Sequence, residues 1–166
     1  MPNLDLNWFA AYTRPRHEKV TATSLEQRGY EVVYPRYRLA SRWKDRVKQL
    51  ELPLFPGYLF VRCDPWKRLL VLQAPGLLHL VSDRAGPLPV PDSEVENLRR
   101  AMFSRARLEP VPFLRAGDRV RVRCGPLAGM EGILVAKRDS LRVVISVELL
   151  ARSVAVELDG DWLAKN

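Results

Sequence analysis

The sequence predicts an α+β domain with a mainly antiparallel sheet and flanking helices, followed by a small all-β barrel. Two observations lead to this fold class. In the first hundred or so residues, strand-like and helix-like segments mix without the regular β–α–β alternation of a parallel sheet. From about residue 115, four or five short β-rich runs follow one another with no helical stretch, which is typical of a small barrel.

The elements of the first domain follow from apolar periodicity and from turn residues. Residues 17–28 have apolar side chains at helical spacing and end before Gly29, a common stop signal. The expected strands are 6–13, 30–35, 58–61 and 77–82, the expected helices are 17–28, 64–73 and one that starts at 93, and a hairpin is expected at about 36–52.

Two helix starts carry capping residues. Asp64 precedes Pro65 and is expected to cap a short helix. Ser93 and Glu96 have the spacing of a capping box, in which each side chain bonds a free backbone amide of the other residue. The helix that they would start carries its apolar face on Val95, Leu98, Met102 and Phe103.

The most informative stretch of the first domain is residues 54–61, with the sequence LFPGYLFV. Its Pro-Gly pair predicts a tight turn that leads into a strand. Alternation along that strand places Tyr58 and Phe60 on one face, and Leu59 and Val61 on the other. Because both faces are apolar, the aromatic face is either covered by helices or kept for a partner.

The basic residues are concentrated in one segment. Residues 14–48 hold 10 Lys and Arg against 4 Asp and Glu, which is +6 of the net charge of +8. Within this segment, basic side chains alternate with aromatic and aliphatic ones along the expected hairpin, whose tip lies near 41–45. This pattern suits phosphate contact and base stacking. The alternative is a solubilising edge hairpin that blocks aggregation.

Residues 106–114 lose periodicity and contain Pro110 and Pro112, which predicts a linker. The domain boundaries that follow are 1–105 for the α+β domain and 115–166 for the barrel.

No arrangement for catalysis or metal binding emerges. Cys63 and Cys124 lack zinc-site spacing, and we expect both thiols to be buried. His17 and His79 lie apart, and we expect His79 in the core. The sequence therefore predicts a protein that is not an enzyme and has no cofactor and no metal. No apolar run is long enough to span a membrane and no signal peptide is evident, so a cytoplasmic protein is expected.

These segments resemble the NusG-like transcription elongation and antitermination factors, which pair an N-terminal NGN domain with a KOW domain of SH3-like fold. In the first domain the resemblance is carried by Trp8-Phe9, the block 54–61 and Asp64-Pro65, with features similar to the antiterminator RfaH. In the second it is carried by residues 117–122, 125–132 and 152–159.

The resemblance implies a docking site for RNA polymerase. In the family, the NGN domain binds the clamp helices of the largest polymerase subunit through an apolar pocket. The matching positions are Tyr12, Phe55 and Tyr58, with Trp8 beside them. The alternative is that Phe55 and Tyr58 are simply core residues.

Further contacts are implied with nucleic acid and with a second protein. Arg14 matches a position that contacts DNA in the antiterminator, and together with the basic segment this indicates a nucleic-acid surface for DNA of the transcription bubble or nascent RNA. We expect that surface to comprise Arg14, Arg16, Arg42, Lys44 and Arg46. In the KOW domain, the family's partner loop, which meets Rho or a small-subunit ribosomal protein, falls on Leu149, Leu150 and Arg152. Leu150 could equally be a core residue.

The expected function is that of a monomeric factor that rides on RNA polymerase and alters pausing or termination. The alternative from another class is a stand-alone RNA-binding or ribosome-associated KOW protein. That alternative would require affinity concentrated in the barrel. Residues 109–166, however, hold 9 basic against 8 acidic side chains, a net charge of only +1.

Overall fold

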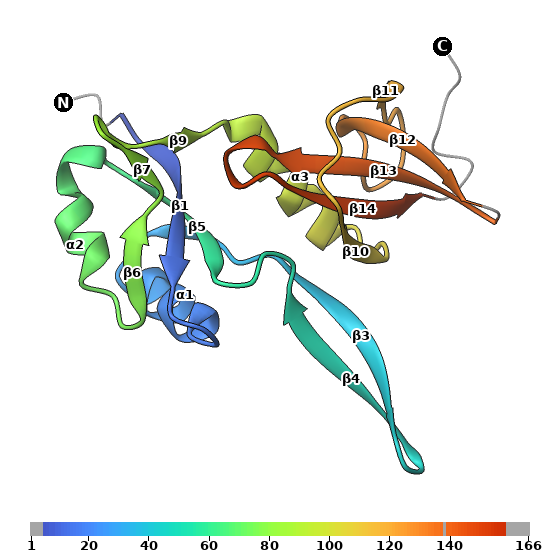
Figure 1. The fold of residues 1–166 in the computed structure, drawn as a ribbon, viewed down its shortest axis with the longest axis horizontal. Coiled ribbons are helices and arrows are strands. Elements are labelled where there is room, and N and C mark those ends of the chain that lie inside the picture. The colour runs from blue at the N-terminus through green and yellow to red at the C-terminus, as the bar shows by residue number, and fades with distance from the viewer. Residues whose placement is uncertain (1–4, 138, 159–166) are drawn as a thin grey trace. The chain divides into compact units, whose positions relative to one another are not determined.

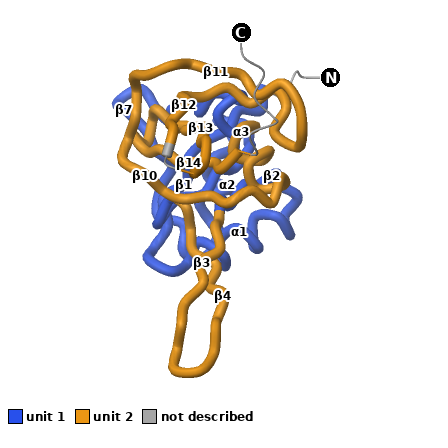
Figure 2. The backbone as a smooth tube through the Cα atoms, turned by 90° about the vertical axis from the view of Figure 1, so that its right-hand side faces the viewer, with its two compact units in different colours: residues 1–35, 55–95 blue, residues 36–54, 96–166 orange. Residues whose placement is uncertain are grey.

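The computed structural model describes residues 5–137 and 139–158. The chain divides into two compact units, shown in different colours in Figure 2. The first unit comprises residues 1–35 and 55–95, and the second comprises residues 36–54 and 96–166. The eight residues 159–166 of the expected barrel lie outside the described residues.

The first unit is built on an antiparallel sheet with strand order β2-β5-β1-β6, in which β9 also pairs with β1. Its strands are β1 (Asn7–Thr13), β2 (Glu31–Val33), β5 (Tyr58–Cys63), β6 (Leu77–Leu80) and β9 (Pro89–Val90), with a small separate ribbon of β7 (Ser82–Asp83) and β8 (Gly86–Pro87). Its helical elements are α1 (Glu18–Gln27), the 3-10 turn η1 (Pro65–Lys67) and α2 (Arg68–Leu72). All four strands and both helices expected in this region are present.

One face of this sheet forms the core with α1 and α2. Leu59 and Val61 are fully buried in it, as the alternation of β5 predicts. They pack with Leu25 from α1 and Val71 from α2. Asp64 caps η1 as expected, because the Trp66 N–H donates to its Oδ1 at 2.9 Å.

The capping box predicted at Ser93 is wrong. Helix α3 (Asp92–Phe103) starts before Ser93, and the Glu94 N–H already donates to the Pro91 carbonyl at 3.1 Å. The turn therefore starts at Pro91, and Ser93 lies inside the helix. The apolar face is also shorter than predicted, because Val95 and Leu98 are buried whereas Phe103 is 88% exposed.

The second unit contains an all-β region with strand order β10-β14-β13-β12-β11. Its strands are β10 (Leu108–Val111), β11 (Arg119–Arg121), β12 (Glu131–Lys137), β13 (Ser140–Val147) and β14 (Arg152–Leu158), with the 3-10 turn η2 (Glu148–Leu150) before β14. Val143 of β13 pairs with Val156 of β14, Ile145 pairs with Val154, and all four are buried, which gives this region its own core. The predicted fold class, a helix-plus-sheet N-terminal part followed by an all-β region, is confirmed.

Part of the segment 106–114, which we predicted to be a linker, is a strand. β10 pairs with β14 in register from Leu108 opposite Val156 to Val111 opposite Ser153. Two interactions hold it there. Arg142 Nη1 donates to Glu109 Oε2 at 2.7 Å, and the Leu114 N–H donates to Ser153 Oγ at 3.0 Å.

The basic hairpin consists of β3 (Arg36–Trp43) and β4 (Arg46–Pro53), which Figure 1 shows as a long two-stranded ribbon. Its last pair is Trp43 with Arg46, so Lys44 and Asp45 make the turn inside the predicted tip. Lys44 has a φ of +49°, a left-handed conformation that two-residue hairpin turns require.

We predict that Glu109→Ala loosens β10. The Arg142 side chain is only 11% exposed, so removing Glu109 leaves a largely buried guanidinium without its partner. Hydrogen exchange at the β10 and β14 amides should accelerate by an amount equal to about 1–3 kcal/mol of local stability.

The matched control is Glu148→Ala, which removes the exposed ion pair with Arg115 at 3.4 Å. Its effect should stay below about 1 kcal/mol, because exposed ion pairs contribute little. Equal effects from the two substitutions would contradict a role for the Glu109–Arg142 pair in holding β10.

Candidate functional site

Three rings from neighbouring strands form a row on the second face of the first unit's sheet. The register places Tyr12 opposite Tyr58 on β5 and opposite His79 on β6. The ring centroids of Tyr12 and Tyr58 are 5.1 Å apart, and those of Tyr12 and His79 are also 5.1 Å apart. Tyr12 and Tyr58 are half-buried and His79 is exposed, so this aromatic row (Tyr12, Tyr58, His79) presents ring surface to solvent.

The four residues predicted to dock polymerase therefore separate into two groups. Tyr12 and Tyr58 lie in the aromatic row, whereas Trp8 and Phe55 are only 4% and 1% exposed. Phe55 packs edge-on against Phe60, with ring centroids 6.0 Å apart and planes at 88°. The alternative reading of Phe55 as a core residue matches its burial.

The row is aligned by a buried carboxylate at the start of α1. Glu18 is 6% exposed, and its Oε1 accepts a hydrogen bond from the Gly57 N–H at 2.8 Å. The Gly57 carbonyl in turn accepts from the Thr13 N–H at 2.7 Å. These two bonds join the start of α1, the Pro-Gly turn and the end of β1.

Gly57 cannot be replaced without disturbing the row. Its φ is +86°, a conformation that side chains other than glycine rarely adopt. A Cβ atom at this position would lie 3.0 Å from Cε2 of Tyr12. The sequence predicted the tight turn, and the structure adds that the glycine makes room for the tyrosine ring.

His79 was expected in the core and is exposed instead, so that prediction is wrong. The physical reason is the register of β6, which places His79 beside Tyr12 on the face opposite the core. Its Nδ1 lies 3.3 Å from the Leu80 carbonyl oxygen. The sequence did not indicate either His79 or Glu18 as part of the site. Strand pairing brings His79 to the aromatic row, and the tertiary fold brings Glu18 to the Pro-Gly turn.

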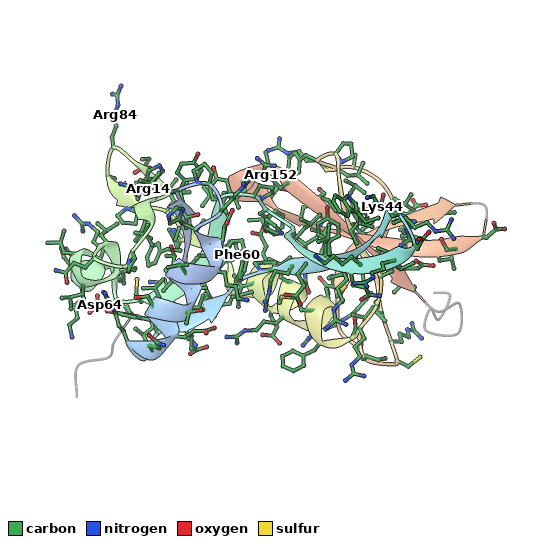
Figure 3. The ribbon with its side chains drawn as sticks, turned by 90° about the horizontal axis from the view of Figure 1, so that it is seen from below. Arg14, Lys44, Phe60, Asp64, Arg84 and Arg152 are labelled. Atoms are coloured by element: carbon green, nitrogen blue, oxygen red, sulfur yellow. The ribbon has the colours of Figure 1, made fainter. Side chains whose placement is uncertain are left out.

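The predicted nucleic-acid residues are all exposed and belong to two units. Arg14 and Arg16 follow β1 in the first unit, where Arg16 has a φ of +63°. Arg42, Lys44 and Arg46 lie at the hairpin tip in the second unit. Figure 3 labels Arg14 and Lys44 among the side chains. Trp43, beside Lys44, is 74% exposed, which provides a ring for base stacking at the tip.

The predicted partner loop of the C-terminal region is the turn η2. Leu149 and Leu150 are half-buried in it, so neither is a fully buried core residue. Ala151 closes the turn in a left-handed conformation, with φ +49° and ψ +51°. Arg152, labelled in Figure 3, follows it at the start of β14 and is exposed.

The cysteines differ in environment. Cys63 is buried, and burial together with the nearby Asp64 carboxylate raises the pKa of its thiol to about 11, so it stays protonated and unreactive at neutral pH. Cys124 is exposed, so the expectation that both thiols are buried is wrong for Cys124. Its position beside the turn that starts at Gly125, outside the strands, explains the exposure.

The described part of the chain offers neither a cluster of metal ligands nor a helix suited to a bilayer. Across residues 5–137 and 139–158, no group of three or more His, Cys, Asp or Glu side chains could hold a metal ion. In that same part of the molecule, no helix is both long enough and apolar enough to cross a membrane.

A sequence model of a protein family, described as "Transcription termination factor nusG", matches residues 6–99. The chain belongs to the NusG family. The match covers the sheet with the aromatic row and most of α3, which is the region in which the sequence resembles an NGN domain.

Two relatives align with nearly the whole chain. The "Transcription termination/antitermination protein NusG" of Pseudomonas aeruginosa is 27% identical over 155 residues, which is 89% of this chain and 86% of the relative. The protein of the same name from Thermus thermophilus is 26% identical over 186 residues, 98% of this chain and 100% of the relative.

A solved structure described as "Domain interaction in Thermotoga maritima NusG" has the same fold. It superposes with a TM-score of 0.52 at 22% identity, over 95% of this chain and 96% of that one. NusG-family proteins are transcription factors rather than enzymes. The predicted family is confirmed, whereas the RfaH-like detail stays a prediction.

We predict that Glu18→Ala destabilises the first unit by about 1.5–3 kcal/mol, because the Gly57 N–H loses a buried charged acceptor. Glu18→Gln keeps an acceptor oxygen and should recover part of the loss. Chemical denaturation followed by the near-ultraviolet dichroism of the tyrosines measures both.

The control is Glu26→Ala, an exposed glutamate on the same helix, which should change stability by less than about 0.5 kcal/mol. If Glu18→Ala is as mild as this control, the carboxylate does not hold the Pro-Gly turn.

Proposed function

We propose that this NusG-family protein binds the clamp helices of the largest RNA polymerase subunit through the aromatic row. The observation that carries the proposal is the row itself, because three rings stand side by side on a sheet face and remain partly open to solvent. Rigid aromatic side chains of this kind are typical interface anchors.

In this proposal the four predicted residues have different roles. Tyr12 and Tyr58 contact the clamp directly. Trp8 and Phe55, which are buried, support the sheet from within and keep the tyrosine rings in place. Glu18 acts as a positioning residue through its bond to Gly57.

Binding alters transcription if the protein favours one state of the polymerase. A factor that binds the processive state more tightly than the paused state shifts the equilibrium toward elongation. We propose that the C-terminal region, to whose sheet β10 also belongs, recruits Rho or a small-subunit ribosomal protein through Leu149, Leu150 and Arg152. Tethering raises the partner's effective concentration near the polymerase.

We further propose that the basic residues contact DNA of the transcription bubble or nascent RNA. The exposed tip of the hairpin, with Arg42, Lys44 and Arg46 around the exposed Trp43 ring, supports this assignment. The alternative of a stand-alone KOW protein is less well supported, because the relatives that match 89–98% of the chain are termination/antitermination proteins.

The double substitution Tyr12→Ala and Tyr58→Ala should abolish co-purification with RNA polymerase. Two interface anchors at about 2–4 kcal/mol each correspond to a loss of about a thousandfold or more in affinity. Phe103→Ala removes a ring that is 88% exposed on α3 and is the control that should bind normally. Circular dichroism checks that each variant is folded. Unchanged capture of polymerase by a folded double variant would refute the docking site.

The triple substitution of Arg42, Lys44 and Arg46 by Gln should weaken binding to single-stranded nucleic acid and flatten its salt dependence. The slope of log K against log salt should fall by about 0.7 for each phosphate that is no longer neutralised, or about 2 in total. The control removes the same charge from exposed positions elsewhere, by Lys19→Gln, Arg84→Gln and Arg119→Gln. A slope that changes equally in both variants would leave the hairpin as a solubility device.

A further inference from the structure

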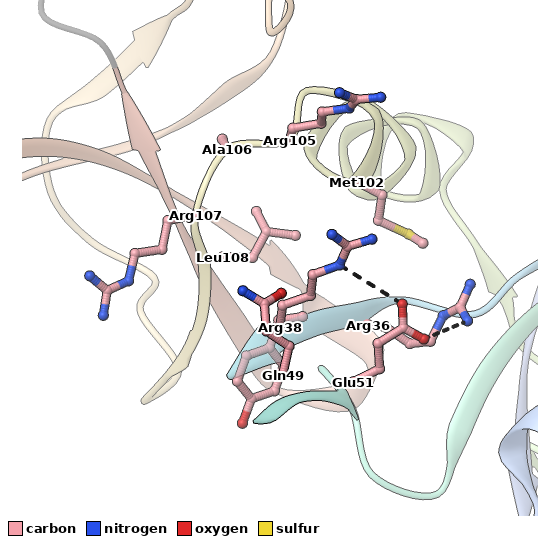
Figure 4. A pocket seen from close by; sticks show the side chains of 10 residues that line it. Arg36, Arg38, Gln49, Glu51, Met102, Arg105, Ala106, Arg107 and Leu108 are labelled. Atoms are coloured by element: carbon pink, nitrogen blue, oxygen red, sulfur yellow. Dashed lines mark hydrogen bonds and ion pairs between the residues drawn. The ribbon is translucent and has the colours of Figure 1, made fainter. Parts of the chain in front are cut away.

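A cavity of about 750 Å³ lies within the second unit, between the base of the hairpin and the segment that joins α3 to β10 (Figure 4). One wall carries Arg36, Tyr37 and Arg38 from β3. The other carries Arg105 and Arg107 from the α3–β10 segment. Its volume is in the range of sites that bind small molecules or single groups of larger ones.

The lining is strongly basic. Among the lining residues that the structure describes, four are arginines and Glu51 is the only acidic one. Glu51 lies 3.3 Å from Arg36 and 4.0 Å from Arg38, as the dashed lines in Figure 4 mark. Among the residues that the structure describes, no carboxylate pairs with the guanidinium of Arg105 or Arg107. A concave surface with this excess of positive charge focuses its field on an anion.

Local structure fixes both walls. On β3, alternation places Arg36, Arg38 and Arg42 on one face of the ribbon. After α3, the Ser104 hydroxyl donates to the Ala101 carbonyl at 2.7 Å and accepts from the Ala106 N–H at 3.1 Å. Arg105 has a φ of +57°, which reverses the chain inside this hydrogen-bonded turn. The guanidinium groups are therefore carried by ordered backbone.

The cavity also has an apolar part. Met102 and Leu108 line it opposite the hairpin. The buried Leu108 anchors the start of β10 opposite Val156. Guanidinium groups beside apolar side chains match the two parts of a nucleotide, the phosphate and the base.

We propose that this cavity binds one nucleotide of a single-stranded nucleic acid, with Arg105 and Arg107 on its phosphates and the side chains of Met102 and Leu108 against its base. The inference rests on the proposed nucleic-acid contact of the hairpin and extends it from the tip to the base. Arg42, Arg38 and Arg36 mark the path between these two places, because they lie on the same face of the ribbon. A strand is favoured over a free mononucleotide because the positive face continues beyond the cavity.

The test uses the full-length protein and a labelled single strand of about 12 nucleotides, as DNA and as RNA, with fluorescence anisotropy over a salt series. Arg105→Gln with Arg107→Gln should weaken binding by about tenfold and reduce the salt slope by about 1.4. The control, Arg84→Gln with Arg119→Gln, removes the same charge from exposed positions outside the cavity and should stay within about twofold of the unaltered protein.

A substitution that is expected to strengthen binding distinguishes a lost contact from a loss of structure. Glu51→Gln removes the carboxylate that lines the cavity beside Arg36 and Arg38, and it should tighten binding by about threefold. Glu26→Gln, an exposed glutamate in the first unit, is its control and should leave the affinity within about twofold of the unaltered protein. A variant that merely unfolds cannot bind more tightly.

The outcomes separate this proposal from the function on which it rests. If the hairpin-tip variant loses binding and the Arg105/Arg107 variant does not, the cavity proposal falls and the hairpin contact stands. If neither loses binding, both fall. Tighter binding of a duplex of the same sequence, or equal competition by adenosine monophosphate or inorganic phosphate, also refutes a strand site. Capture of polymerase should be unchanged by Arg105→Gln with Arg107→Gln.

Discussion

The hydrogen bond from the Gly57 N–H to the buried Glu18 carboxylate is the interaction on which the candidate site depends. A carboxylate removed from water is tolerated only when donors satisfy it, and here the donor is the backbone of the turn that starts β5. The bond fixes where β5 begins relative to α1. The register of β5 on β1 then places Tyr58 beside Tyr12, and β6 adds His79. A polar interaction inside the fold thus determines the arrangement of apolar rings on its surface.

In the second unit, the ion pair of Arg142 with Glu109 has a comparable structural role. It reaches from β13 past β14 to β10, and it attaches to the sheet a segment whose two prolines argue against a strand. Proline is tolerated at a sheet edge, where its missing N–H faces outward, and β10 is such an edge. The hydroxyls of Ser146 and Ser153, 2.6 Å apart, continue the attachment toward Leu114.

Much of this structure could be predicted from sequence, because strands, helices and the hairpin tip are local patterns. The order of elements, the burial of Leu59 and Val61 and the cap at Asp64 all follow from neighbours within a few residues. The predictions that were wrong concern residues whose structure depends on partners far away in the sequence. β10 joins the sheet through Arg142, which lies 33 residues beyond Glu109. His79 is exposed because the register of β6 places it beside Tyr12. The arginine-lined cavity likewise joins segments separated by some fifty residues of chain, which no local pattern could bring together.

The pairing of β10 also sets how far the C-terminal region can move from α3. With β10 in the sheet, only residues 104–107 connect the helix to the strand, and four residues span at most about 14 Å. If β10 left the sheet, the connection would run to the start of β11 at Arg119, fifteen residues with a reach of about 50 Å. The pairing of β10 therefore sets the length of chain that connects α3 to the rest of the C-terminal sheet. This pairing would decide the volume that the partner proposed for the C-terminal region could search.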